Sequence, residues 1–350
     1  MNISRAQIGL GVYLPKKILD NDELERRKIM LPSGKILTAD QILKKIGVER
    51  RHIAGPEETV ADMGCKAAET ALKNNKNIDL LLASTSHPVH YNLALEIRSH
   101  LHLGTPEVYD FHTACTGSAR MFAYLYDNRD KVHGKKVLLV ASEKFSKSVI
   151  DLTTDGMLNL DRSLGQTIFG DGSAAVSFTE GKDIRILNAK TIQLPDPSGM
   201  TNLICMAMGE NKFFEPCFVH PVAGSDCNPD YPDGYFTQNG PRVYEVVRNA
   251  VPAIIRDTVR DAGLHPKDID LVIIHPGSKR MFDALRDSLK PDFSVYSDYA
   301  DGNMSSVSLL YSFIKALKEN LIGSGSTVVL SGFGAGSPHL YSSTVVIEIK

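Results

Sequence analysis

The second half of the chain repeats the order of segments found in the first half. A helical pattern over residues 59–72 leads into the apolar run 79–85, and a helical pattern over residues 243–259 leads into the apolar run 268–275. Continuous apolar runs of this length are typical of strands buried on both faces of a parallel sheet. The repeated succession predicts a duplicated, layered α/β fold with parallel strands and crossover helices.

The later segments of the two halves correspond as well. A run at residues 108–115 is followed by a helical pattern, and so is the run at residues 295–306. The apolar strand expected at residues 136–143 has its counterpart at residues 327–334. We therefore expect two structural halves of similar size, which we place at residues 1–185 and 186–350.

Three polar side chains stand where strands of these halves are expected to end. In open parallel sheets the reactive groups gather at the carboxyl ends of the strands. That rule selects Cys115 in the first half and His275 and Asn303 in the second. Asn303 also falls close to the duplicate of the Cys115 position, so the sequence predicts that the three face one site.

Cys115 lies among small residues, directly before a helical pattern. The unsatisfied amides of a helix N-terminus carry partial positive charge and favour a thiolate over a thiol. The small neighbours leave room for an acyl group beside the sulfur. Taken alone, a free cysteine is more often a small buried hydrophobe, and His275 and Asn303 could equally be a structural histidine and a turn residue. Their common position favours a functional interpretation.

A thiol, an imidazole and an amide in one cavity suit covalent acyl transfer. The thiolate attacks a thioester and forms an acyl-enzyme. Nε2 of His275 and the amide of Asn303 can donate hydrogen bonds to a developing enolate oxygen on a second thioester. Backbone amides of Cys115 and Ala335, the latter in an expected glycine turn at residues 332–336, can form an oxyanion hole. The set fits carbon–carbon bond formation between two thioesters better than hydrolysis.

Composition excludes several other classes of function. The net charge is −2, and no apolar run reaches the roughly 18 residues of a membrane span. We expect neither a nucleic-acid partner nor a membrane partner. The beginning of the sequence lacks the features of a signal peptide, and five scattered cysteines do not resemble a disulfide framework, so we expect a cytoplasmic protein.

A metal site must be considered because one stretch is rich in cysteine and histidine. Cys205, Cys217, His220 and Cys227 lie close together in a loop rich in Pro and Gly. No two cysteines have the C-x₂₋₄-C spacing that zinc sites use, so we expect no metal.

Several longer motifs point to a known family. They are Gly47-Val-Glu-Arg-Arg-His-Ile-Ala-Gly-Pro, Thr113-Ala-Cys-Thr-Gly-Ser, Ile168-Phe-Gly-Asp-Gly-Ser-Ala-Ala-Val and Asp301-Gly-Asn-Met-Ser-Ser. With these motifs the chain resembles the thiolase-fold condensing enzymes, most closely β-ketoacyl-acyl-carrier-protein synthase III, over nearly its whole length. The resemblance implies a layered αβαβα thiolase fold.

The resemblance also implies roles for the residues. Cys115 would be acylated, and His275 and Asn303 would drive decarboxylation of a malonyl thioester. Both substrates would be carried on coenzyme A or on the phosphopantetheine of an acyl-carrier protein, with no further cofactor. A homodimer is implied, whose partner subunit caps the acyl pocket near Tyr91. We expect further substrate-binding residues at Phe169, Tyr244, Phe333 and Lys45.

The chain departs from the family in two places. His275-Pro-Gly and Gly302-Asn-Met-Ser-Ser resemble the type III polyketide synthases instead. The tryptophan that stacks on the coenzyme A adenine in many synthases III is missing, since the chain has no Trp, and Gln41 stands near its place. These departures favour a specialised condensing enzyme over the starter enzyme of fatty-acid synthesis.

We expect an acyltransferase that performs a decarboxylative Claisen condensation. One alternative is a related acyltransferase of specialised metabolism that passes the acyl group to a non-malonyl acceptor. Another is a non-catalytic partner subunit of a condensing enzyme. The presence of Cys115, His275 and Asn303 together argues against the second alternative.

Overall fold

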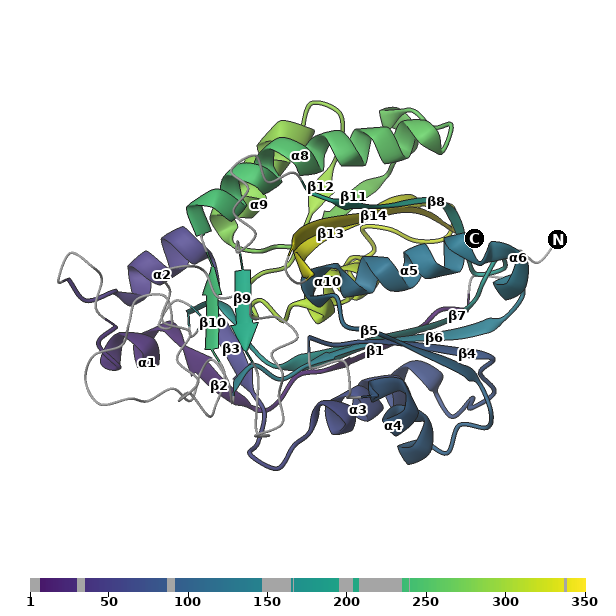
Figure 1. The fold of residues 1–350 in the computed structure, drawn as a ribbon, viewed down its shortest axis with the longest axis horizontal. Helices are drawn as coiled ribbons and strands as arrows, with labels where there is room; N and C mark the ends of the chain where they lie inside the picture. The colour runs from purple at the N-terminus through teal and green to yellow at the C-terminus, as the bar shows by residue number, and fades with distance from the viewer. Residues whose placement is uncertain are drawn as a thin grey trace.

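The structure is a computed structural model that describes residues 7–29, 35–86, 92–146, 165, 167–194, 204–207, 235–238, 240–336 and 339–350. Five layers stack in the order helices, sheet, helices, sheet, helices (Figure 1). This arrangement confirms the layered αβαβα fold that the family resemblance implies. No helix in the described ranges is long and apolar enough to span a membrane.

The first sheet has the strand order β1-β7-β6-β4-β5. Its strands are β1 (Gly9–Tyr13), β7 (Gly172–Thr179), β6 (Lys136–Glu143), β4 (Leu80–Ser84) and β5 (Glu107–Phe111). β4 pairs in parallel with both β5 and β6, whereas β7 is antiparallel to its neighbours β6 and β1. β5 lies at the open edge of the sheet.

The second sheet repeats the first in the order β8-β14-β13-β11-β12. Its strands are β8 (Ile184–Gln193), β14 (His339–Ile349), β13 (Thr327–Gly336), β11 (Leu271–Ile274) and β12 (Val295–Tyr296). β11 is parallel to β12 and β13, and β14 is antiparallel to β13 and β8. We propose that the halves meet near the start of β8, close to the expected boundary.

The expected parallel strands form most of each sheet but not all of it. In each sheet one strand, β7 in the first and β14 in the second, runs antiparallel to the other four. The reason is visible at β13 and β14, which only two residues separate in the chain. Such a short connection can join antiparallel strands but cannot return the chain for a parallel pairing.

Helices fill the three remaining layers (Figure 1). Two helices, α5 (Gly117–Asp127) and α10 (Ser306–Lys318), lie between the sheets. The first sheet is covered on its outer face by α3 (Val60–Leu72) and α4 (Leu93–His100). The second sheet is covered on its outer face by α8 (Gly240–Asp261) and α9 (Lys279–Leu289). The remaining described elements are β2 (Lys17–Asp20), α1 (Asn21–Arg26), α2 (Ala39–Ile46), β3 (Arg50–Ile53), η1 (Ala114–Thr116), α6 (Arg129–Val132), β9 (Ile204–Ala207), β10 (Tyr235–Gln238) and η3 (Pro266–Asp268).

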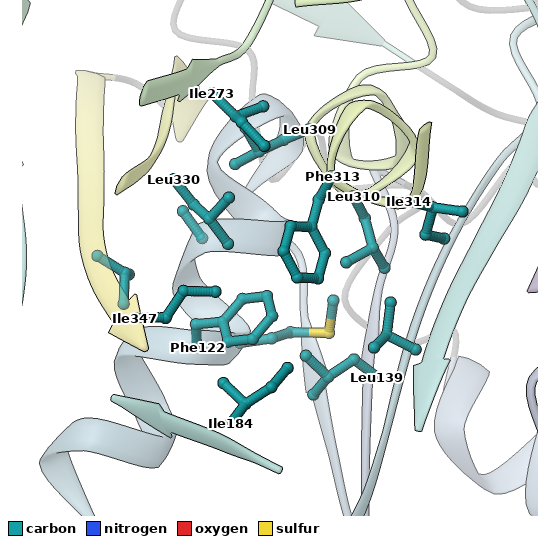
Figure 2. Close-up of a cluster of buried hydrophobic side chains, with 14 of the residues drawn as sticks. Phe122, Leu139, Ile184, Ile273, Leu309, Leu310, Phe313, Ile314, Leu330 and Ile347 are labelled. Carbon is teal, nitrogen blue, oxygen red and sulfur yellow. The ribbon is translucent and has the colours of Figure 1, made fainter. Parts of the chain in front are cut away.

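The largest hydrophobic core lies between the two sheets, around α5 and α10 (Figure 2). Phe122 of α5 and Phe313 of α10 meet edge to face with their ring centroids 6.3 Å apart. Leu139 and Leu330 contribute from the two sheets to the same cluster. Because the two central helices are packed against each other and against both sheets, their first turns are held in fixed relative positions.

Candidate active site

The three residues selected by their strand-end positions come together in the structure. Cys115 lies in η1 at the start of α5, His275 directly follows β11, and Asn303 lies in the loop before α10. Cys115 Sγ is 3.5 Å from the Ser305 hydroxyl, and the Ser305 amide donates a 2.8 Å hydrogen bond to Asn303 Oδ1. Asn303 Nδ2 in turn lies 3.5 Å from Nε2 of His275.

β13 passes directly against the cysteine. A Cβ atom added at Gly334 would lie 2.6 Å from the Cys115 Cβ and 3.2 Å from its Sγ. A Cβ at Gly332 would lie 2.8 Å from the Cys115 carbonyl oxygen. The expected turn at residues 332–336 is thus wrong, because these residues form the end of β13. The glycines are needed for close approach of the strand to η1.

Cys115 is partly exposed as a residue, but its sulfur is closely surrounded by protein. Burial raises the pKa of the thiol to about 12, the hydrogen bond with Ser305 opposes this shift, and the Glu143 carboxylate adds to it. The thiolate that the helix start was expected to favour is therefore not the resting form. The thiol must lose its proton when the sulfur attacks.

His275 is held as a neutral imidazole. Its side chain is buried, and the ring meets Phe333 edge to face with centroids 5.4 Å apart. Burial lowers the pKa of His275 to about 3. Nδ1 has no hydrogen-bond partner among the described residues. A neutral imidazole in this place can donate or accept a hydrogen bond but supplies no positive charge.

The Asn303 amide is held in one orientation by its neighbours. Its Oδ1 accepts the hydrogen bond from the Ser305 amide, and Nδ2 also lies 3.4 Å from the Gly277 carbonyl. The backbone of Asn303 donates to the Ile168 carbonyl and accepts from the Gly170 amide. The amide hydrogens therefore face the His275 side, where the two side chains can share one acceptor.

A charged cluster secures the loop that carries Asn303. The buried Asp301 carboxylate accepts hydrogen bonds from Arg50 Nε and the Tyr311 hydroxyl, each at 2.6 Å, and His52 Nε2 lies 3.6 Å away. Burial acts to raise the pKa of Asp301, but these partners together hold it well below its usual range. Gly302, with a φ of +89°, completes the bend.

The other expected site residues are placed differently. The Phe333 ring touches His275, so it lines the site. The backbone of Phe169 pairs with Asn303 by a β-bridge, and its ring stacks on Phe145. Lys45 is exposed on α2, and Tyr244 on α8 lies under the guanidinium groups of two arginines. Ala335 follows Gly334 in β13 and pairs with Leu340 on β14.

Some sequence expectations lie outside the described residues. They concern Tyr91, Cys217, His220 and Cys227, and nothing in the structure bears on the side chain of Cys205.

The structure also adds a group that the sequence analysis did not select. Glu143, at the end of β6, is buried and accepts hydrogen bonds from Ser86 and Ser306. Ser305, with a φ of +47°, joins this group to Cys115. One feature of the sequence could have identified Glu143, because it is an acidic residue at the end of an apolar strand. A buried charge at such a position costs free energy unless it is hydrogen-bonded.

Comparison with known proteins supports the same family for both halves. The sequence model for 3-oxoacyl-[acyl-carrier-protein (ACP)] synthase III matches residues 109–194, which contain Cys115. The model for the synthase III C-terminal region matches residues 259–345, which contain His275 and Asn303. The chain is a synthase III-like condensing enzyme. By class it is an acyltransferase with the thiolase fold.

Relatives match over nearly the full length. The β-ketoacyl-[acyl-carrier-protein] synthase III of Campylobacter fetus subsp. fetus is 28% identical over 346 residues and covers 94% of each chain. The Aquifex aeolicus protein of the same name is 27% identical over 341 residues, which are 94% of this chain and 95% of the relative.

Solved structures give the same fold. Synthase III of Aquifex aeolicus VF5 has a TM-score of 0.73 at 23% identity, covering 98% of this chain and 99% of that one. The priming β-ketosynthase of the R1128 polyketide pathway has a TM-score of 0.77 at 25% identity, covering 99% of this chain and 96% of that one.

Proposed function

We propose that Cys115, His275 and Asn303 carry out a decarboxylative Claisen condensation between an acyl thioester and a malonyl thioester. The observation that carries this proposal is the linked set of contacts from the Cys115 sulfur through Ser305 and Asn303 to His275 Nε2. The nucleophile Cys115 and the two side chains that can stabilise an enolate, His275 and Asn303, thus lie in one site. The names of the relatives favour this reaction over acyl transfer to a non-malonyl acceptor.

In the first half-reaction the Cys115 sulfur attacks the acyl thioester and the carrier thiol leaves. The resulting acyl-enzyme separates one difficult step into two easier ones. Backbone amides of Cys115 and Ala335 are proposed to stabilise the tetrahedral oxyanion. The close approach of Gly334 to the sulfur supports this, because it brings the β13 backbone beside the reacting carbon. Such a donor is typically worth a factor of about 10²–10³ in rate.

In the second half-reaction the malonyl thioester loses CO₂, and its enolate attacks the acyl group on Cys115. Negative charge develops on the malonyl thioester oxygen. The amide hydrogens of Asn303 and an Nε2–H of neutral His275 are proposed to bind that oxygen. The low pKa of His275 fits this role, because a neutral ring can donate to the enolate without first trapping the malonyl carboxylate as an ion pair.

Both substrates are proposed to arrive on a phosphopantetheine thiol, on coenzyme A or on an acyl-carrier protein, with no further cofactor. Gln41, near the expected adenine position, closes the capping box of α2 with Thr38. Its side chain is amide rather than aromatic and is engaged locally. This supports an acyl-carrier protein over coenzyme A as the preferred carrier, with Lys45 exposed on the same helix.

A homodimer is proposed from the edge of the first sheet. β5 lies at this edge, and Tyr109 on it is exposed at 41%. An open strand with an exposed large side chain is a ready site for pairing with another strand. The mass of the protein in solution, measured by light scattering for the wild type and Tyr109→Lys, tests this proposal. Monomers for the wild type would contradict it.

Release of CO₂ from a malonyl thioester tests the function. Cys115→Gln lacks the nucleophile but keeps His275 and Asn303, so we expect it to decarboxylate malonyl thioesters without condensing them. Adding Asn303→Ala to this variant should reduce CO₂ release by about 10²–10³-fold, the effect of losing one preorganised donor. If neither the wild type nor Cys115→Gln releases CO₂ on either carrier, the condensation proposal is wrong.

A further inference from the structure

The thiol proton of Cys115 has no base in the proposed mechanism. His275 is not within hydrogen-bonding distance of the sulfur, and its contacts in the described chain are to Asn303 and Phe333. The polar side chain beside the sulfur is Ser305, at 3.5 Å. A hydroxyl can pass a proton on but does not retain it near neutral pH, so the route beyond Ser305 decides where the proton goes.

The route beyond Ser305 leads to a buried carboxylate. The hydroxyls of Ser305 and Ser86 are 2.9 Å apart, and the Ser86 hydroxyl is 2.8 Å from Glu143 Oε1. Ser86, Ser305 and Glu143 are all buried. A continuous series of hydrogen bonds therefore joins the Cys115 sulfur to Glu143 through two hydroxyl groups.

The number of protons in this series fixes its direction. An ionised carboxylate only accepts hydrogen bonds, so the Ser86 hydroxyl donates to Glu143. Ser86 then has no second proton, and Ser305 must donate to it. Ser305 in turn can only accept from the Cys115 thiol. When Glu143 is ionised, every hydrogen bond in the series points from the sulfur toward the carboxylate.

We propose that Glu143, acting through Ser86 and Ser305, takes the proton of the Cys115 thiol during acylation and returns it to the leaving carrier thiolate. The inference rests on the proposed function. As the S–C bond forms, the S–H bond breaks, each serine passes one proton on, and Glu143 becomes a carboxylic acid. When the tetrahedral intermediate collapses, the bond from carbon to the carrier sulfur breaks and the proton returns by the same route.

The electrostatics of the site suit a stored proton. One negative charge is present before and after the transfer, first on Glu143 and then on the oxyanion of the tetrahedral intermediate, so no additional charge is created. Burial raises the pKa of Glu143 to about 7, against hydrogen bonds from Ser306 and Ser86 that lower it. The carboxylate can therefore both accept and release a proton near neutral pH. Glu143 does not touch the reacting atoms and is a positioning residue.

Other ionisable groups near Glu143 are directed elsewhere. Lys144 donates to the carbonyls of the loop before α3, and Asp62 on α3 is bonded to its own cap residue. Asp171, one residue before the β7 partner of Glu143, accepts from backbone amides, including those of Phe145 and Ser146. Among the described residues, Thr85 and Ser86 after β4 and Ser306 at the start of α10 place their hydroxyl groups against it. Cys115 is thus the titratable group that faces Glu143.

The pH dependence of acylation tests the inference. Under single-turnover conditions, the rate at which an acyl thioester modifies Cys115 is followed by intact-protein mass spectrometry from pH 5.5 to 9.5. In the wild type we expect the rate to rise with the ionisation of a group of pKa about 7. In Glu143→Gln this rise should vanish, and the rate at pH 8 should fall by about 10²-fold or more, a typical loss for general base catalysis.

Matched variants separate a relay from a structural effect. Ser305→Ala interrupts the series but keeps the carboxylate, so the acylation rate should also lose its rise near pH 7. If Glu143→Gln does not fold, the Ser305→Ala profile alone tests the relay. Ser306→Ala removes a donor to Glu143 outside the series and should keep the rise, displaced to higher pH. Ser142→Ala, a buried serine that donates to Val60, should leave the profile unchanged.

The outcomes also distinguish this inference from the proposed function. If the wild type is acylated and Glu143→Gln or Ser305→Ala keeps the same pH profile, the relay is wrong and the condensation proposal stands. If the wild type forms no acyl adduct at any pH, the proposed function is lost and the relay with it.

Discussion

The two strand-to-helix connections that meet at the site occupy equivalent places in the two halves but are held in different ways. The connection from β5 through η1 to α5 is short and carries Cys115. It is held by contact, since the β13 backbone at Gly332 and Gly334 leaves no room for a side chain. The connection from β12 to α10 is longer and carries Asn303. It is held by the ion pair of Asp301 with Arg50 and by the hydrogen bond of Asp301 with Tyr311.

The difference matches the two chemical roles. A nucleophile must keep its position against a neighbouring strand, and steric contact restricts it without adding charge near the sulfur. The amide of Asn303 must point its hydrogens in one direction, and a loop with several hydrogen bonds fixes that orientation. Duplication thus supplied equivalent positions, and different restraints allow them to perform different chemistry. Each prediction below removes one of these restraints or one of the groups that they hold.

The largest effect is expected from Cys115→Ala. Condensation should fall by more than about 10³-fold, because the acyl-enzyme cannot form. Cys65→Ala is the matched control, since Cys65 is buried on α3 and burial raises its pKa to about 12. Steady-state product formation by both variants checks this expectation; equal losses in the two would point to a structural effect.

Asn303→Ala tests the role given to the longer connection. We expect condensation to fall by about 10²–10³-fold, while acylation of Cys115 stays within about tenfold of the wild type. The split arises because the amide is assigned to the malonyl enolate and not to the acyl group. Asn188→Ala, which removes a buried amide that donates to Thr258, should slow neither half-reaction selectively. Equal slowing of acylation and condensation by Asn303→Ala would contradict the assignment.

Gly334→Ala tests the steric restraint on the nucleophile. The added methyl would lie within 2.6 Å of Cys115, and forcing atoms into packed space costs about 1–3 kcal/mol of stability. Denaturant unfolding measures this loss, and alkylation of Cys115 should slow in parallel. Gly323→Ala is the control, because nothing lies within 4 Å of a Cβ there. Equal stability of the two variants would show that contact does not hold η1.

Asp301→Asn tests the charged restraint, with a smaller effect that depends on pH. Hydrogen bonding to Asp301 raises the pKa of His52, so the pair stabilises the fold fully below the unfolded pKa of about 6.5 and less as pH rises through the folded pKa. The unfolding free energy should therefore drop by about 1–2 kcal/mol at pH 6 and by less at pH 8. Asp301 itself stays ionised over this range, because its pKa is depressed.

Urea unfolding at the two pH values measures this difference. Asp257→Asn, which removes a carboxylate paired with Arg260 on the surface of α8, should show no comparable dependence on pH. A larger loss for Asp301→Asn at pH 8 than at pH 6 would contradict the role given to His52.

The sequence predicted the fold and the central site because both follow local rules. Apolar strands with polar residues at their carboxyl ends, repeated in two halves, were enough to place Cys115, His275 and Asn303 together. The antiparallel strands and the glycines of β13 were missed, since pairing direction and close approach depend on segments distant in the chain. Glu143 was missed for the same reason: its contacts to Ser86 and Ser306 join residues 57 and 163 positions apart.

The protonation states of Cys115 and His275 could not be predicted from the sequence either. A cysteine before a helix suggested a thiolate, but the structure surrounds the sulfur with protein and places a carboxylate near it, which raises the thiol pKa. Likewise, nothing in the order of residues around His275 indicates that burial keeps it neutral. Such shifts come from the packing of several elements around one side chain.

The central claim is that Cys115 carries the acyl group. Its most direct test is the mass of the protein and of its peptides after brief incubation with an acyl thioester, offered both on coenzyme A and on an acyl-carrier protein. The account predicts a mass increase equal to one acyl group, located on the peptide with Cys115 and missing in Cys115→Ala. An unmodified protein with both carriers, or an adduct at Cys65 in place of Cys115, would contradict it.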